Sequence, residues 1–344
     1  MGSGPEISVV VGAYSRRNYL VGAVRSLIGQ TLPRDRFEIV VTKNFRDPEI
    51  DRELDRAGAV VLFDEEPRVG RWLRRAVDRS TAPIVTFLND DDEYEPERLA
   101  EILAIWRRLP ELGFYRNRVR VIDRDGLPIS PERWRRHETD REFDRNGPVY
   151  LPAARRHGML ELANGLASPM FNTSTMALRR DLLDGEIGEE FERVHTDDFF
   201  LFVASILSPF GVYLDDRRLT RFRFTGESVT HTVPWLGEAA ASYAEIAGFA
   251  ARRGAPELAL WLRGLAVHYD RMFRGSGLVE RIRGRATRNE VAHRTGEYLR
   301  FLGAHPEERR LDLDTWGAAA YGLAYLGIPS LVRKVAGVRP TSRL

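Results

Sequence analysis

Four short apolar runs alternate with helical patterns over the first hundred residues of this 344-residue chain. The runs lie at Ile7–Val11, Phe37–Val41, Ala59–Phe63 and Ile84–Leu88. Continuous β-branched and apolar runs of this length are typical of strands buried on both faces of a sheet. Strands and helices in alternation therefore predict an α/β fold, with a mainly parallel, Rossmann-like sheet flanked by helices.

The intervening segments carry apolar residues at helical spacing. Helices are expected near residues 20–28, at Arg71–Ala76, and after Pro96, which sits where the first turn of a helix tolerates proline. Periodicity is weak from Phe114 to about Gly165, so this stretch is expected to be irregular. Met170–Leu178 and Phe199–Leu207 are the next pieces expected to be ordered.

The chain changes character near residues 233–235 and becomes rich in Ala, Leu and Arg. We expect one unit at 1–234, with halves at about 1–113 and 114–234, and a helical C-terminal region at 235–344. From Leu236 onward 17 basic residues stand against 11 acidic ones, a net charge of +6, whereas the first 235 residues carry −4. A basic tail on a slightly acidic body is expected to meet an anionic surface.

An uncharged stretch at Thr315–Val332, followed by Arg333 and Lys334, lies within this tail. Three readings stay open: a terminal helix docked on the body, an interfacial helix, and a membrane span weakened by its glycines and Pro329. With residues 315–344 at an anionic membrane surface, the protein is expected to be cytoplasmic and peripheral at the inner face of the cell membrane.

Several function classes are excluded by what the sequence lacks. There are no cysteines, which removes disulfides, thiolate nucleophiles and cysteine metal sites. The dinucleotide fingerprint, the P-loop, the zincin motif and the nucleophile elbow are also missing. Arginines are numerous but mixed with acids and without interleaved aromatic motifs, so no nucleic acid partner is expected.

The strongest local signal is IVTFLNDDD, in which Asp90, Asp91 and Asp92 directly follow a buried strand. Ligands of open α/β sheets bind at the carboxyl ends of the strands. Three neighbouring carboxylates repel one another unless a cation neutralises them, and hard oxygen ligands suit Mg²⁺ or Mn²⁺ together with a substrate phosphate. The alternative is a solvated acidic turn favoured by the dipole of the next helix.

A second acidic pair, Asp197 and Asp198, opens an apolar segment in HTDDFFLFVASIL. Thr196 or Asp197 can cap the helix expected there, which alone would explain both acids. Alternatively, one carboxylate faces the cleft as a general base.

Together these segments resemble the family 2 glycosyltransferases, inverting enzymes of the GT-A type, over roughly residues 7–230. The likeness rests, in order along the chain, on ISVVVGAYSRRNYL, RVGRWLRRAV, FLNDDDEYEPERL, HTDDFFL and FRFTGESVT. They look like the family's nucleotide-contacting loop, its diphosphate segment, its metal-binding D-x-D region, its Glu-Asp motif and its closing Arg-x-His-x-x-Ser-x-Thr segment.

The resemblance implies a transferase that moves a sugar from a nucleotide-diphosphate sugar to an acceptor hydroxyl, of a glycan or a lipid-linked saccharide, with inversion. Asp198, paired with Asp197, falls on the base position, and Asp92 on the position that holds Mn²⁺ or Mg²⁺. Tyr14 stands where the nucleobase is often stacked. The residues expected to bind the donor are Gly12, Ala13, Tyr14, Arg16, Lys43, Asn44, Gly70, Arg74, Asp90 and Asp91.

The acceptor side carries less signal. Asn172, Thr173, Ser174 and Trp235 are candidates to line it, and a packing role explains them equally well.

Lys43 and Asn44 replace the Asp with which the family usually contacts uracil, which leaves UDP, GDP and dTDP donors open. Thr225 stands where a metal-contacting His is frequent. A nucleotidyltransferase and a non-catalytic nucleotide-sugar or glycan-binding protein are the alternatives, and the oligomeric state is open.

Overall fold

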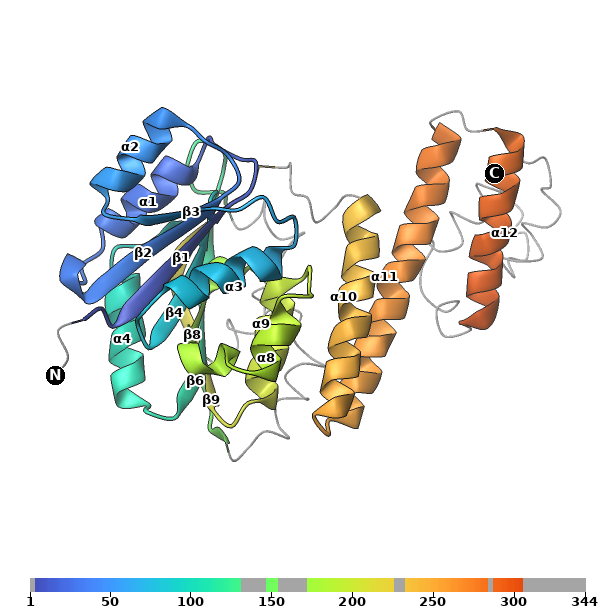
Figure 1. Ribbon diagram of the computed structural model, residues 1–344. Helices are drawn as coiled ribbons and strands as arrows, with labels where there is room; N and C mark the ends of the chain where they lie inside the picture. Colours follow the sequence, from blue (N-terminus) through green and yellow to red (C-terminus); the bar gives the residue numbers. More distant parts are fainter. Residues whose placement is uncertain (1–3, 131–146, 154–171, 226–232, 284–286, 306–344) are drawn as a thin grey trace. The chain divides into compact units, whose positions relative to one another are not determined.

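The computed structural model describes residues 4–130, 147–153, 172–225, 233–283 and 287–305 (Figure 1). Within the chain, contacts group residues 1–227 and 228–344 into two compact units. The predicted segment 315–332 lies outside the described residues. In the part of the chain that is described, no helix is both long and apolar enough to cross a membrane.

The first unit is built on a mixed sheet of nine strands in the order β3-β2-β1-β4-β8-β6-β9-β5, with β7 pairing to β9. Its strands are β1 (Ile7–Ala13), β2 (Phe37–Lys43), β3 (Val60–Phe63), β4 (Ile84–Asn89), β5 (Glu93–Tyr94), β6 (Leu112–Ile122), β7 (Val149–Leu151), β8 (Met176–Arg179) and β9 (Gly211–Arg223). Strands β1 to β4 pair in parallel, whereas β8 runs antiparallel to both β4 and β6. The α/β fold class predicted from the alternation is confirmed.

Helices cover both faces of this sheet (Figure 1). They are α1 (Leu20–Ile28), α2 (Pro48–Arg56), α3 (Val69–Arg79), α4 (Arg98–Arg108), α8 (Glu186–Phe191) and α9 (Asp197–Leu207), with short 3₁₀ turns η1 (Arg34–Arg36), η5 (Thr173–Thr175) and η6 (Arg180–Leu183). Ile7, Val9 and Val11 alternate along β1 and pack in one buried cluster with α1, α2 and α4. The opposite face of the sheet is covered by α3 and α9, and the inner strands β1, β2 and β4 are buried almost throughout.

The expectation of an irregular segment after Phe114 is wrong where β6 is concerned. Residues Leu112–Ile122 form one strand, which pairs with β9 in parallel and with β8 antiparallel. Its apolar pattern is broken by Arg116 and Asn117, both fully buried. Asn117 accepts a hydrogen bond from the buried Arg98 and donates one to Thr220, so polar partners from other elements satisfy the buried polar side chain that interrupts the apolar pattern.

The second unit contains the helices α10 (Val233–Arg252), α11 (Pro256–Arg283) and α12 (Arg288–Ala304). Helix α10 packs on α11 through Tyr243 and Tyr269, whose ring centroids are 4.8 Å apart. Helix α12 begins with a capping box in which Thr287 and Glu290 satisfy each other's backbone N–H groups. The helical character expected after Pro234 is found in these described helices.

Candidate functional site

The carboxyl ends of β1, β2 and β4 lie side by side at one edge of the sheet. The registers pair Ala13 with Lys43 and Gly12 with Asn89, so the turns that follow these strands start at the same level. Strand order reverses at β1, whose neighbours are β2 on one side and β4 on the other. A crevice at such a switch point is the usual ligand site of an open α/β sheet.

The turn after β4 carries two carboxylates held by one arginine of the turn after β1. Arg16 Nη2 lies 2.5 Å from Asp90 Oδ1, and Arg16 Nη1 pairs with Asp91 Oδ2. The Asp90 backbone N–H donates to Gly12 O at 3.1 Å, which ties the two turns together. Asp90 Oδ2 is buried without a hydrogen-bond partner. Burial raises the pKa of Asp90 to about 7, and the positive charge of Arg16 acts against that rise.

Asp92 has a different environment from its two neighbours. It is only 1% exposed; its Oδ1 accepts from the Arg223 N–H at 3.0 Å, and its Oδ2 accepts from Asn172 Nδ2 at 2.8 Å and Ser174 Oγ at 2.6 Å. Both oxygens are therefore engaged in fastening the turn to β9 and η5. These three hydrogen bonds leave Asp92 less room for a cation than a carboxylate with an unpartnered oxygen, and its role as the metal ligand stays a prediction.

A divalent metal fits Asp90 and Asp91 better. The first has a buried oxygen without a partner, and the second is partly exposed. Among the described residues there is no group of three or more His, Asp or Glu that could hold a metal by themselves. A metal at this turn would therefore complete its shell with water and phosphate oxygens, as Mg²⁺ commonly does in nucleotide sites.

The acidic pair at the start of α9 reaches the same edge. Thr196 occupies the N-cap position, and its side chain makes no capping bond. Asp197 Oδ2 accepts from Thr173 Oγ1 at 2.6 Å. Asp198 accepts from its neighbour, the Phe199 N–H, at 2.8 Å and from the Asn172 N–H at 3.0 Å. Burial raises the pKa of Asp198 to about 7, and the charge of Asp197 adds to the rise.

Asn172 joins the two acidic groups. Its backbone N–H donates to Asp198 and its side-chain amide donates to Asp92, while its Oδ1 accepts from the Ser174 N–H at 2.8 Å and from Asn89 Nδ2 at 3.2 Å. Its φ of 64° is rare for a residue with a side chain. Asn172, Thr173 and Ser174 are all buried, and their described contacts are with the acids rather than with an open acceptor surface.

Arg223, at the end of β9, is a second residue whose role sequence reasoning missed. Besides its backbone bond to Asp92, its side chain donates to the carbonyl oxygens of Asp91, Asp123 and Arg124 and pairs with Glu93 at 2.5 Å. The one available signal was its place as the Arg of the closing segment. Its guanidinium holds the acidic turn from the side of β9.

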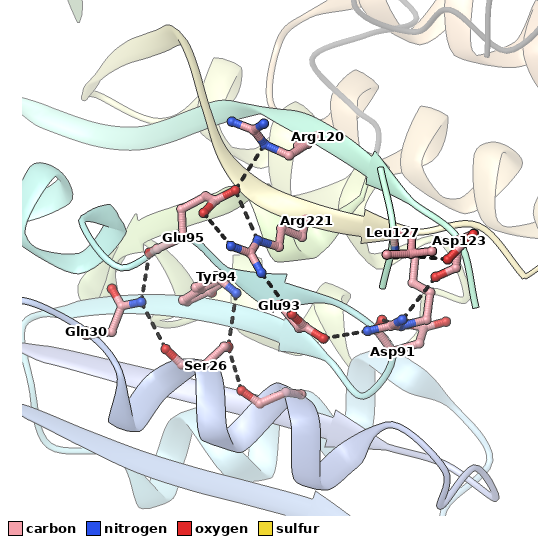
Figure 2. Close-up of polar contacts among 12 residues, drawn as sticks. Ser26, Gln30, Asp91, Glu93, Tyr94, Glu95, Arg120, Asp123, Leu127 and Arg221 are labelled. Carbon is pink, nitrogen blue, oxygen red and sulfur yellow. Dashed lines mark hydrogen bonds and ion pairs between the residues drawn. The ribbon is translucent and has the colours of Figure 1, made fainter. Parts of the chain in front are cut away.

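A set of ion pairs lies beside Arg223 on the outer strands, where Arg120 and Arg221 contact Glu93 and Glu95 (Figure 2). Arg221 Nη2 lies 3.0 Å from Glu95 Oε2, and Arg120 Nε lies 3.1 Å from Glu95 Oε1. Arg221 also approaches Glu93 at 3.5 Å. Glu93 and Glu95 are thus paired with arginines of β6 and β9.

The loops after β1 and β2 hold several residues predicted to bind a donor. Tyr14 is 39% exposed. Asn44 accepts from the Ser15 N–H at 2.6 Å and donates to Ser15 Oγ at 3.1 Å, which joins the two loops. Lys43 is buried, and its ammonium pairs with Asp51 of α2 at 2.7 Å and donates to Phe45 O at 2.5 Å. The charge of Lys43 is therefore balanced inside the protein.

Four further predicted donor residues are packed or bonded within the protein. A Cβ on Gly12 would lie 2.4 Å from the ring of Trp72, and a Cβ on Gly70 would lie 1.8 Å from the carbonyl oxygen of Phe191. Arg74 pairs with Asp78 at 2.9 Å and also donates to the carbonyl oxygen of Leu183. Ala13 is buried at the end of β1.

Trp235 belongs to the second unit. Its ring packs edge-on against Tyr269 of α11, with centroids 5.8 Å apart. Nothing in the first unit's geometry bears on its predicted acceptor role.

A family model described as "Glycosyl transferase family 2" matches residues 8–184, which is more than half of the chain. The chain belongs to this family. The matched range contains Gly12 through Ser174 and therefore both turns that meet at the acidic site. Asp198 and Arg223 lie beyond its end.

Solved structures share the fold of this chain. TarS of S. aureus, residues 1–349 in complex with UDP-GlcNAc, is 12% identical with a TM-score of 0.56, over 96% of this chain and 90% of that one. The longer TarS structure is 13% identical with a TM-score of 0.52, and this chain spans 55% of its length. A search of curated protein sequences finds no match.

Proposed function

We propose that this chain is an inverting glycosyltransferase that moves a sugar from a nucleotide-diphosphate sugar to an acceptor hydroxyl. The observation that carries the proposal is the shared contact at Asn172, which brings the carboxylate of Asp198 to the same edge as the acidic turn of Asp90–Asp92. A candidate base and a candidate anchor for the donor diphosphate thus lie at one edge of the sheet of a family 2 chain. The TarS complex with UDP-GlcNAc is a protein of this fold with such a donor bound.

Asp198 is the proposed general base. Its carboxylate takes the proton of the acceptor hydroxyl while the hydroxyl oxygen bonds to the anomeric carbon from the face opposite the diphosphate. The bond from the anomeric carbon to the diphosphate oxygen breaks, and the nucleoside diphosphate leaves with the bonding electrons. The transition state resembles an oxocarbenium ion, and no protein nucleophile is needed. Asp197 assists by raising the pKa of Asp198.

Donor binding is assigned to the loops at the strand ends, with Tyr14 and Asn44 beside the nucleobase and Arg16 near the phosphates. Asp91 and Asp90, rather than Asp92, would hold Mn²⁺ or Mg²⁺. Such a metal, when bound, offsets the charge that develops on the leaving diphosphate. Asp92, Asn172 and Arg223 keep the turn in place.

The test of this proposal is an assay of nucleoside diphosphate release from UDP-, GDP- and dTDP-sugars with saccharide acceptors. We expect release of a nucleoside diphosphate that depends on the acceptor, and Asp198→Asn should lower the rate by about 10²–10⁴-fold while donor binding is retained. Asp184→Asn, an exposed acid on the same unit, is the control and should keep full activity. Release of pyrophosphate would show a nucleotidyltransferase, and near-full activity of Asp198→Asn would remove Asp198 as the base.

We further propose that the acceptor is a saccharide or lipid-linked saccharide reached at an anionic membrane surface through residues 315–344. The support is the uncharged stretch at 315–332 and the net charge of +6 beyond Leu236. Each basic residue near an anionic leaflet contributes about 1 kcal/mol of binding. The full chain should float with anionic liposomes and a chain lacking 315–344 should not. Equal sedimentation of both would contradict the proposal.

A further inference from the structure

Arg16 supplies the positive charge at the acidic turn. Its two terminal nitrogens contact one oxygen each of Asp90 and Asp91. The side chain of Arg16 is 46% exposed, whereas those of Asp90 and Asp91 are 3% and 15% exposed. One half-exposed guanidinium thus lies over two much less accessible carboxylates, which would otherwise repel each other.

The carboxylates that Arg16 occupies are the ones that best fit a metal. The neighbouring Asp92 has its oxygens engaged by Asn172, Ser174 and Arg223, so it offers no equivalent place for a cation. A divalent cation bound to Asp90 and Asp91 would stand within a few ångströms of the guanidinium and be repelled by it. The arginine and the metal therefore compete for the same two side chains.

Arg16 has the freedom and the chemistry to change partners. It follows Ser15, which has a φ of 62°, in a loop before α1, and its exposed side chain can move without opening the buried cluster. A diphosphate accepts the two parallel N–H bonds of a guanidinium as readily as carboxylates do. The loop already lies at the strand edge where the proposed donor binds.

We propose that Arg16 is the resident counter-cation of Asp90 and Asp91, and that it competes with a divalent metal until a nucleoside diphosphate takes its guanidinium. This inference rests on the proposed function, because it places metal and diphosphate at the same edge. It makes metal binding depend on the nucleotide: the metal alone binds weakly, and the two together bind well.

The test is titration of Mn²⁺ into the full chain, followed by electron paramagnetic resonance of the free ion, without nucleotide. We expect Arg16→Gln to bind Mn²⁺ about tenfold or more tightly than the wild type, because removal of a facing charge removes a repulsion. Arg17→Gln is the matched control: it makes the same charge change one residue away, where Arg17 lies 3.8 Å from Asp47. Its effect should stay within about threefold, since an exposed charge is screened.

Arg16→Lys separates the loss of the positive charge from the loss of the two-point contact. Lysine keeps the charge but loses the two-point contact, so its Mn²⁺ affinity should lie between those of the wild type and Arg16→Gln. The inference is overturned if Arg16→Gln binds Mn²⁺ no better than the wild type, if Arg17→Gln matches it, or if none of the proteins binds Mn²⁺.

A second titration adds UDP, GDP or dTDP. The nucleotide should raise the Mn²⁺ affinity of the wild type by a larger factor than that of Arg16→Gln. Only the wild type has a guanidinium that can move from the aspartates to the diphosphate. An equal factor in both proteins would contradict the exchange. If no nucleotide changes either protein while Arg16→Gln still binds Mn²⁺ more tightly, the proposed function and the exchange fail but the competition stands.

Discussion

Asn172 shows how one residue can set the geometry of two distant carboxylates. Its N–H holds Asp198, and its amide holds Asp92, which lies 80 residues earlier in the chain. The backbone adopts φ 64° and ψ 105°, which few side-chain-bearing residues tolerate. Strain of this kind persists where the surrounding contacts require it and is frequent at functional sites. The sequence marked Asn172 only as a candidate for the acceptor site or for a packing role, because its hydrogen-bond partners lie far away in the chain.

Glycine and alanine at position 172 separate the strain from the lost hydrogen bonds. Both Asn172→Gly and Asn172→Ala remove the bond to Asp92, but only alanine keeps a Cβ at positive φ. We expect Asn172→Ala to be less stable than Asn172→Gly by about 1 kcal/mol in urea unfolding. Equal stabilities would mean that the backbone at this position is not strained.

The raised pKa of Asp198 predicts a pH dependence of stability. From its ordinary value of 3.8 the pKa rises to about 7 in the folded protein. Between these values the folded protein keeps a proton that the unfolded chain has released, so the stabilisation is present below pH 4 and is lost as pH rises through about 7. The free energy of unfolding should therefore fall more between pH 5 and pH 8 in the wild type than in Asp198→Asn. A parallel pH dependence in the two proteins would contradict the raised pKa.

At the scale of elements, the strands and their end turns could be predicted but their partners could not. Apolar runs showed β1 to β4, and the acids after β4 marked the right edge of the sheet, because both signals are local. Strand β6 was missed because Arg116 and Asn117 are buried there beside partners from α4 and β9. The part that Asp92 plays in fastening the turn was not predicted, since its three hydrogen bonds come from residues 80 to 131 positions away.

Alanine substitutions at two glycines are expected to have opposite effects on stability, because only Gly70 lies against the backbone of another element. A Cβ at Gly70 meets the carbonyl of Phe191 at 1.8 Å, so Gly70→Ala should destabilise the protein by about 1–3 kcal/mol. A Cβ at Gly22 in α1 meets only Glu93 Oε1 at 3.7 Å, so Gly22→Ala should stabilise it by about 0.5–1 kcal/mol. Thermal unfolding of both variants measures this; the same sign for both would refute the close-packing account.

Two arginines of β9 that lie two residues apart form a matched pair. Arg223 is buried and donates to three backbone carbonyls, so Arg223→Gln should cost about 2–4 kcal/mol of stability. Arg221 is partly exposed and pairs with Glu95, so Arg221→Gln should cost about 0–1 kcal/mol and less at high salt. Denaturant titration at two salt concentrations compares them. A larger loss for Arg221→Gln would reverse the assigned roles.

At the scale of the whole molecule, every residue assigned to the donor and to the base lies within residues 1–227, the first compact unit. The family model shows the family, and the solved structures show the fold. They leave the nucleotide to be decided by the loops after β1 and β2, where Asn44 is bonded to Ser15 and Lys43 is bonded to Asp51. The ammonium of Lys43 is thus paired within the protein.

Calorimetric titration of UDP, GDP and dTDP into the full chain, each with and without Mn²⁺, shows whether the chain binds a donor nucleotide together with a metal. We predict that one of these nucleotides binds, that Mn²⁺ tightens its binding, and that Asp91→Asn with Asp90→Asn removes the Mn²⁺ effect while the folded state is kept. Absence of binding by all three nucleotides, with Mn²⁺ present and the protein folded, would contradict the account and leave a scaffold without donor chemistry.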